Sequence, residues 1–532
     1  MTASAHPHEQ PDLVASQPRP GRFCYWLCPA LLAVALYAVT LRGGYVYDDV
    51  WLLTEDPRLH DPSQWSRYLT ESYNKSVDNL YRPLTSLSYA VGWWLHGDRK
   101  WAFHLVNILL HAAVCACVAE VALRLTRGNR TAALIAGLLF AAHPVHVEAV
   151  ANVAGRPELI CALGLFGAIA LSLKPITLWR GCAIGACTAV AIFGKEQGIF
   201  LPPMLIALFA ARRWSGCRDL GAARALSITL CVCLLGYIIA RNAVLPFSWE
   251  RFAIDWTVNP MVPSSGNRLG GSVGRDAWLM PVVLLGRYAA LLIAPARLSP
   301  DYGALVIGCV ARFDDPYLYL GFAALLTWAF ALAWSIRCRS WSGIFLCIAL
   351  ALTYSMVGNF MSYIGTIFAE RLMYTPSAFF LILLAVPLSR VAANLRIAVM
   401  TVLLLAGGLR TYTYARLWND PLKLYQTTSA QKPGSVKLRI LLAHQYMIRG
   451  DFPDAERVAA EARSVLPQYA DVWVRSAIIA MEQKKWDQAG EYLHIAMQVD
   501  PHSYVLDWFA ELARRRAAAS PATSQTSSSQ QQ

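Results

Sequence analysis

Two adjacent carboxylates follow the first long apolar run of the chain. They are Asp48 and Asp49, and Tyr47 precedes them. At a membrane surface such a pair can divide the chemistry, because one carboxylate can accept a proton from a nucleophile while the other orients it or holds a divalent cation. A solvated turn, or the N-cap of the next helix, is the simpler interpretation, and the spacing alone favours it.

A second polar cluster ends a later apolar run. It contains His143, His146 and Glu148, and two histidines with one glutamate over six residues could bind a metal. However, Pro144 interrupts the helical face between them, and no further ligand lies close in sequence. We therefore interpret the cluster as interfacial packing and capping, and we predict no metal site there.

Ionisable pairs also stand at the ends of apolar runs. Lys195 and Glu196 form one pair, and Glu370 and Arg371 form another. Charged groups at membrane depth are costly and indicate function by default, although a position at the interface lowers the cost. On the topology predicted below, these pairs converge on one outer face, which favours a single shared cavity. Other members of this polar set are Arg82, Arg156 and Asp301.

The composition indicates what must position these groups. The 532 residues are 56% apolar and 15% charged, whereas globular proteins average about 45–50% and about 25%. With a mean hydropathy of +0.38, this excludes a disordered or fibrous protein and argues against a soluble enzyme. The net charge of +13 comes from basic residues clustered in the short connections between apolar runs. Basic residues in such connections set the orientation of a membrane protein. We therefore predict contact with membrane lipid and no nucleic acid partner.

Twelve apolar segments approach the length of about 20 residues that crosses a bilayer. Basic residues place a disordered N-terminus, residues 1–22, in the cytoplasm and the loop 42–100 outside. The charges of later connections require one re-entrant or interfacial segment near 246–295, so we predict 11 or 12 spans within a membrane domain of residues 23–415. The segments are 23–41, 101–123, 131–150, 158–174, 178–194, 197–211, 222–245, 278–295, 316–336, 341–357, 372–389 and 396–410.

The remainder of the chain carries a repeat of 34 residues. This period, with its small, aromatic and proline positions, is typical of tetratricopeptide helix pairs. We expect a short α-solenoid over 416–515 and a disordered Ser/Gln-rich tail over 516–532. The whole fold is therefore predicted to be all-α. The matched positions are Phe452 with Trp486, Ala455 with Ala489, Ala462 with Ala496, and Pro467 with Pro501.

The polar motifs, taken in order, resemble those of the transmembrane and tetratricopeptide-repeat-containing protein O-mannosyltransferases and their bacterial relatives. The resemblance covers roughly residues 25–510, and the ordered series is more specific than any single motif. The motifs are Tyr47-Asp48-Asp49, Tyr81-Arg82-Pro83-Leu84-Thr85, Phe103 to His111, His143 to Val150, Gly155-Arg156, Gly194-Lys195-Glu196-Gln197-Gly198, Leu298 to Tyr302 and Ala369 to Tyr374.

The resemblance implies a type C glycosyltransferase fold and a polyprenyl-phosphate-linked sugar as donor. The family's acidic pair falls on Asp48 and Asp49, one of which would be the general base, with inversion at the sugar carbon. The departing phosphate would need cations. The candidates are Arg82, Arg156, Lys195 and Arg371, with Arg371 and Arg82 ranked first; the supporting polar residues are His143, His146, Glu148, Glu196, Asp301 and Glu370.

Three functions follow from these observations. The first is a membrane glycosyltransferase, with mannose the expected sugar and the acceptor, a protein hydroxyl or a glycan, held by the repeats. The second is a non-enzymatic scaffold, because tetratricopeptide repeats commonly bind peptides. The third, a flippase or transporter of lipid-linked sugars, ranks last because most ionisable groups lie at span ends. The short repeat array and the lack of a retrieval signal favour a bacterial inner membrane over the endoplasmic reticulum, with the repeats on the outer or lumenal side.

Overall fold

A computed structural model describes most of the chain. The predicted disordered N-terminus, residues 1–22, and residues 520–532 of the predicted tail lie outside the described residues, as does much of the segment 246–295 that was predicted to contain a re-entrant stretch. The described residues are 23–73, 80–216, 223–245, 257, 259–261, 279–303, 305–308, 312–361, 363–501 and 503–519.

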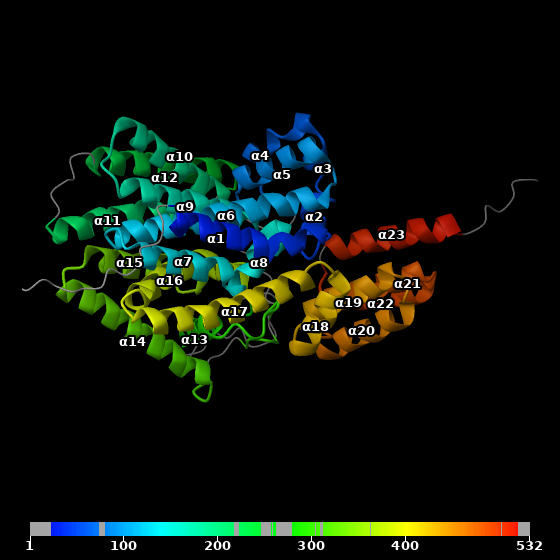
Figure 1. The fold of residues 1–532 in the computed structure, drawn as a ribbon. Helices are drawn as coiled ribbons and strands as arrows, with labels where there is room; N and C mark the ends of the chain where they lie inside the picture. The colour runs from blue at the N-terminus through cyan, green and yellow to red at the C-terminus, as the bar shows by residue number, and fades with distance from the viewer. Residues whose placement is uncertain are drawn as a thin grey trace, which may run out of the picture.

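Helices occupy all twelve predicted apolar segments, and the described residues contain no strand. The predicted all-α fold, a bundle of membrane helices followed by a short α-solenoid, is confirmed (Figure 1). The helices of the bundle are α1 (Cys24–Tyr37) continued by η1 (Ala38–Arg42), α6 (Lys100–Leu125), α7 (Arg130–Ala142), α8 (Val147–Ala151), α9 (Arg156–Ser172), α10 (Leu178–Gly194), α11 (Leu201–Trp214), α12 (Ala223–Val244), α13 (Met280–Ile293), α14 (Pro316–Arg337), α15 (Trp341–Val357), α16 (Tyr374–Leu388) and α17 (Ala393–Leu417).

Six of the described helices are long and apolar enough to cross a membrane, which makes this a multi-pass membrane protein. A seventh span is added if Arg130–Ala142 and Pro144–Ala151, which meet at a bend of 52°, count as one. This number is below the predicted 11 or 12, because other apolar segments fold as shorter helices, such as α10 and α15 with 17 residues each. The six are Cys24–Arg42, Lys100–Leu125, Val153–Ser172, Pro316–Arg337, Glu370–Leu388 and Ala393–Leu417.

The centre of the bundle is formed by helices from both halves of the chain. Helix α6 packs against α1, α7 and α9, and α16 packs against α7 and α15. At the periphery, only 11% of the apolar window is buried in α14 and likewise in α17, as expected of helices that face lipid. Gly286 of α13 lets α14 approach closely, since a Cβ there would lie 1.9 Å from the carbonyl oxygen of Tyr317.

The loop 42–100 is folded rather than extended. It contains α2 (Asp49–Leu53), α3 (Pro57–His60), α4 (Arg67–Thr70) and α5 (Pro83–His96). The buried Arg58 guanidinium binds Asp56 at 2.8 Å and Glu71 at 3.1 Å, which ties α3 to the end of α4. The loop therefore holds the acidic pair on a packed scaffold at one end of the bundle.

The repeat region stacks antiparallel helices at that same end (Figure 1). The alanines matched by the 34-residue period, Ala455 with Ala489 and Ala462 with Ala496, are all buried. Small residues at these positions let adjacent helices pack closely, which explains the repeat. The last helix ends at Ala519 rather than at the predicted domain boundary of 515. The helices are α18 (Pro421–Gln431), α19 (Val436–Ile448), α20 (Phe452–Val465), α21 (Ala470–Glu482), α22 (Trp486–Val499) and α23 (Ser503–Ala519).

Candidate active site

The two carboxylates of the acidic pair have different surroundings. Asp49, the first residue of α2, is fully buried and accepts hydrogen bonds from the backbone N–H groups of Val46 at 3.1 Å and Ala154 at 2.6 Å. Burial raises the pKa of the Asp49 carboxyl to about 7, although these backbone donors oppose the shift. Asp49 thus ties the loop 42–100 to the turn before α9, which is a structural role.

Asp48 is the accessible member of the pair. It stands at the N-cap position of α2, but its side chain caps no backbone N–H there, and the side chain is 28% exposed. The Asp48 side chain is therefore not an N-cap of α2, the alternative that the sequence left open. Its carboxylate faces Arg371 instead, with Oδ2 at 3.9 Å from Nη2.

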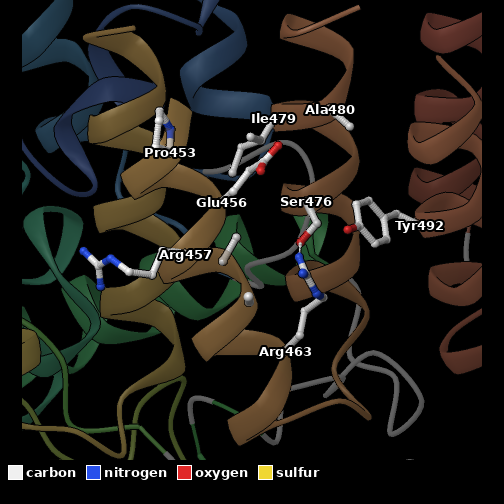
Figure 2. A pocket seen from close by; sticks show the side chains of 10 residues that line it. Pro453, Glu456, Arg457, Arg463, Ser476, Ile479, Ala480 and Tyr492 are labelled. Atoms are coloured by element: carbon white, nitrogen blue, oxygen red, sulfur yellow. Dashed lines mark hydrogen bonds between the residues drawn. The ribbon is translucent and has the colours of Figure 1, made fainter. Parts of the chain in front are cut away.

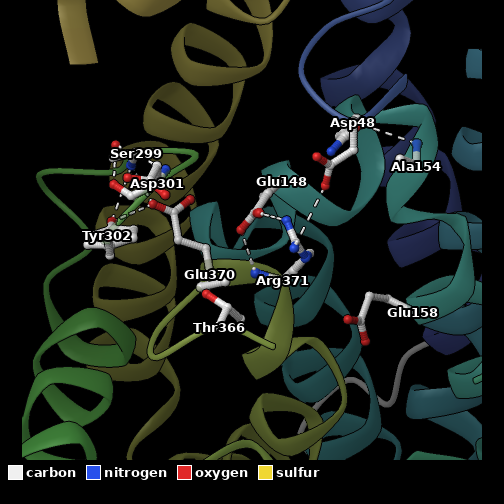
Figure 3. A network of polar contacts seen from close by, with 12 residues as sticks. Asp48, Glu148, Ala154, Glu158, Ser299, Asp301, Tyr302, Thr366, Glu370 and Arg371 are labelled. Carbon is white, nitrogen blue, oxygen red and sulfur yellow. Dashed lines mark hydrogen bonds and ion pairs between the residues drawn. The ribbon is translucent and has the colours of Figure 1, made fainter. Parts of the chain in front are cut away.

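Arg371 is fixed by a buried carboxylate (Figure 3). Glu148, which is fully buried, accepts from Nη1 of Arg371 at 2.5 Å and from its backbone N–H at 2.9 Å. Because Glu148 holds one side of the guanidinium, Nη2 remains directed at Asp48, and the Arg371 side chain is 25% exposed. A fixed cation beside a reachable carboxylate is suited to an anionic group that binds between them.

The neighbouring carboxylates organise the loop that follows α13. Glu370, fully buried, accepts from the backbone N–H of Ser299 and from the Tyr302 hydroxyl, each at 2.6 Å (Figure 3). Asp301 accepts from the Gly303 N–H at 3.1 Å. These contacts hold the loop in place, and a supporting role for Glu370 and Asp301 in a reaction stays a prediction.

Two more ion pairs involve the remaining candidate cations, Arg82 and Lys195. Arg82 binds Glu196 in a bidentate manner, with Nε 3.1 and 3.0 Å from the two carboxylate oxygens and Nη2 2.9 Å from Oε2. Lys195 pairs with Glu158. Each of these cations is paired with a carboxylate, as Arg371 is with Glu148, but all four side chains are less exposed than that of Arg371. Neither cation is therefore as open to a ligand as Arg371.

Arg156 lies inside the protein and is only 1% exposed. Its guanidinium donates to the Asn107 side chain at 2.9 Å, to the Phe103 carbonyl at 3.1 Å and to the Ser88 carbonyl at 3.2 Å. It also stacks 4.5 Å from the Tyr89 ring centroid. Because its donors bind protein groups, this geometry gives Arg156 a structural role and does not support the predicted role as a phosphate ligand.

The two histidines cap and pack, as interpreted from the sequence. His143 Nδ1 accepts from the Val145 N–H at 3.2 Å, which caps the short turn after α7. His146 contacts the Phe140 carbonyl and the Ser377 hydroxyl, each at 2.8 Å. With both ring nitrogens of His146 occupied, it has no free position for a metal.

A divalent cation at the acidic pair is not supported either. Both carboxylate oxygens of Asp49 accept backbone N–H groups, and the Asp48 carboxylate faces the Arg371 guanidinium. Within the described ranges, no group of three or more His, Cys, Asp and Glu residues could hold a metal ion. The residues present therefore do not fit the divalent cation that the sequence left open at this pair.

The repeat helices enclose a separate groove of about 440 Å³ (Figure 2). Glu456, Arg457 and Arg463 bring charge to it, and the Arg463 guanidinium lies 4.8 Å from the ring centroid of Tyr492. Arg463 also donates to the Ser476 hydroxyl. The groove therefore offers charged and aromatic contacts to a ligand.

Sequence reasoning missed two residues near Asp48 that come from the repeat region. Tyr425 of α18 and Lys437 of α19 both contact Tyr47. They belong to none of the polar motifs, and each lies more than 370 positions from its partner in the sequence. No local signal could have identified them.

Fold and site together define an all-α multi-pass membrane protein whose accessible Asp–Arg pair lies where short helical repeats join the bundle. No protein-family model matches the chain. It is 25% identical over 458 residues to Protein O-mannosyl-transferase F38B6.6 of Caenorhabditis elegans, covering 82% of this chain and 62% of the relative. The human Protein O-mannosyl-transferase TMTC1 is 25% identical over 497 residues, covering 83% and 55%.

A third relative has higher identity over a shorter stretch. Protein O-mannosyl-transferase Tmtc2 of Drosophila melanogaster is 32% identical over 301 residues, or 53% of this chain and 30% of the relative. The chain is thus a relative of the protein O-mannosyl-transferases, and the resemblance carried by its motifs is confirmed. It spans 62% of the length of the first of these relatives and 55% of the second.

One solved structure also aligns with the chain. It is ArnT from Cupriavidus metallidurans bound to undecaprenyl phosphate, which covers 87% of this chain and 78% of its own at 16% identity. The TM-score is 0.45, which is too low to assign a fold.

Proposed function

We propose that this chain is a membrane glycosyltransferase that moves a sugar from a polyprenyl-phosphate-linked donor to a hydroxyl group on the outer or lumenal face. The observation that carries the proposal is the accessible Asp48 carboxylate facing Arg371, which the buried Glu148 holds in place. Mannose is the sugar we expect, because the curated relatives are named O-mannosyl-transferases.

The reaction we propose is a single displacement. Asp48 removes the proton from the acceptor hydroxyl, the acceptor oxygen bonds to the anomeric carbon, and the bond from that carbon to the phosphate oxygen breaks with inversion. Negative charge then accumulates on the departing lipid phosphate, and Arg371 stabilises it. At 3.9 Å Asp48 and Arg371 partly neutralise each other, so a phosphate that binds Arg371 frees the carboxylate to act as a base.

The repeats are proposed to present the acceptor. Their groove of about 440 Å³ carries Glu456, Arg457 and Arg463, which are suited to a polar segment of a protein or to a glycan. The same groove also supports the second candidate, a membrane-anchored scaffold with no catalytic activity. A bacterial inner membrane is the location we propose, with the groove on its outer side.

Transfer of radiolabelled sugar from polyprenyl-phosphate donors tests the proposal. Membranes that contain the wild-type chain should incorporate label, with the mannose donor preferred, and Asp48→Asn should abolish incorporation. Asp314→Asn is the matched control, because Asp314 is an exposed carboxylate that pairs with Arg312 and belongs to none of the polar motifs. If Asp48→Asn incorporates as much label as wild type, Asp48 is not the catalytic base. If folded wild type incorporates no label from any donor, the result favours the scaffold.

A further inference from the structure

The segment that joins the bundle to the repeats contacts the loop that carries Asp48. The Tyr425 hydroxyl accepts a hydrogen bond from the Tyr47 backbone N–H at 3.0 Å. Lys437 places its Nζ 4.5 Å from the centroid of the Tyr47 ring. Both contacts fall on the residue immediately before Asp48, so they bear on where that carboxylate points.

Tyr47 has a backbone conformation that needs such support. Its φ is +59°, in the left-handed region that bulky residues rarely occupy. A residue stays in this region only where its surroundings impose it, and such positions concentrate at functional sites. Tyr425 holds the backbone N–H of Tyr47, and Lys437 covers its ring.

The same segment is anchored a second time beside the site. Ser435 donates its hydroxyl to Asp301 Oδ2 at 2.6 Å and also caps α19 by accepting from the Leu438 N–H at 3.1 Å. Next to it, a Cβ on Gly434 would lie 2.2 Å from the Leu305 carbonyl oxygen. The junction is therefore a closely packed interface with the membrane domain.

Lys437 also brings charge to the site. Burial lowers the pKa of its ammonium, but the Tyr47 phenol and the Asp48 and Asp301 carboxylates outweigh burial and raise it. No carboxylate in the described part of the chain forms a direct ion pair with Lys437. Its charge thus acts on Asp48 and Asp301 together rather than being neutralised by one partner.

We propose that Tyr425 and Lys437 are positioning residues of the transferase site, contributed by the repeat segment, which hold Tyr47 so that the Asp48 carboxylate is directed at the acceptor hydroxyl. This inference rests on the proposed function and extends it, since it gives the first repeat helices a part in the chemical step. Transfer would then depend on this junction even when the acceptor groove is intact.

The test uses the full-length chain purified in detergent and a polyprenyl-phosphate-mannose donor. Tyr425→Phe and Lys437→Met should lower kcat on the order of 10- to 100-fold while the KM for the donor stays unchanged. Lys437→Arg should restore most of kcat, because arginine keeps both the charge and the contact with the aromatic ring. The matched controls are Lys423→Met and Tyr412→Phe, both at exposed positions, which should behave as wild type.

Two outcomes would overturn the inference. In the first, Tyr425→Phe and Lys437→Met keep the kcat of the controls. In the second, Lys437→Arg is as impaired as Lys437→Met and both lose thermal stability in proportion, which is the behaviour of a merely structural residue. If Asp48→Asn abolishes transfer while Lys437→Met retains it, this inference fails and the proposed function stands; a folded wild type that transfers no sugar contradicts the proposed function itself.

Discussion

Replacing Arg371 tests whether its guanidinium stabilises the departing phosphate. Glu148 binds Nη1 of the guanidinium at 2.5 Å and leaves Nη2 directed at Asp48. The Arg371 side chain is 25% exposed. A donor aimed at developing charge contributes about 2.7–4 kcal/mol to the transition state, and about 1.36 kcal/mol corresponds to a factor of ten in rate. Because water reaches a quarter of the side chain, the lower end applies, so Arg371→Met should reduce kcat about 100-fold.

Arg371→Lys separates the charge from the geometry. A lysine ammonium keeps the charge, but it cannot hold Glu148 and a phosphate in the same forked arrangement, so we expect a loss of about tenfold. The assay is the initial rate of sugar transfer per folded molecule at saturating donor. Arg312→Lys and Arg312→Met are the controls, since Arg312 is 77% exposed and pairs only with Asp314 among the described residues. A kcat for Arg371→Met that equals that of Arg312→Met would refute the reasoning.

Three further predictions concern stability and are checked by thermal unfolding of the purified chain. Burial raises the pKa of Asp49 from its ordinary value near 4 to about 7, so the folded state favours the protonated carboxyl. This contribution to the free energy of unfolding is fully present below about pH 4 and is lost as the pH rises through about 7. Asp49→Asn, which does not titrate, should therefore lose less stability than wild type between about pH 5 and pH 8; parallel curves would contradict this. Glu196→Gln should destabilise the chain by about 3 kcal/mol, because it leaves the largely buried Arg82 guanidinium without its partner. The double change Arg82→Met with Glu196→Met removes both charges and should destabilise the chain less. Gly155→Ala should cost about 1–3 kcal/mol, since a Cβ there would lie 2.3 Å from the Ala149 carbonyl oxygen, whereas Gly181→Ala meets no atom within 4 Å and should not destabilise.

The helices of the bundle could be predicted because apolar runs of sufficient length determine them. Helices occupy each of the twelve apolar segments, and the 34-residue period located the repeat helices. The number of spans was harder to predict, because the sequence shows an apolar run in both cases, whether the helix has 14 residues, as α13 does, or 26, as α6 does. The breaks between them depend on tertiary packing, as at the 52° bend between α7 and the turn that leads into α8.

The roles of individual charged residues could not be read from the sequence. Asp48 and Asp49 are adjacent and chemically identical, and what separates them is the Ala154 N–H, 105 positions away, which Asp49 binds. Arg156 and Arg371 are both candidate cations, but Asn107 and the Phe103 carbonyl enclose the first while Glu148 leaves the second partly exposed. Such differences arise from contacts between distant segments and leave no local pattern.

The division of the acidic pair is the central claim, and one comparison tests it most directly. Asp48→Asn and Asp49→Asn are purified side by side, and the rate of transfer from the polyprenyl-phosphate-mannose donor is measured per folded molecule together with the melting temperature. The account predicts that Asp48→Asn keeps the wild-type melting temperature and loses transfer on the order of 10²- to 10⁴-fold, while Asp49→Asn melts earlier and keeps most of its transfer. Transfer by Asp48→Asn at the wild-type rate would contradict the account.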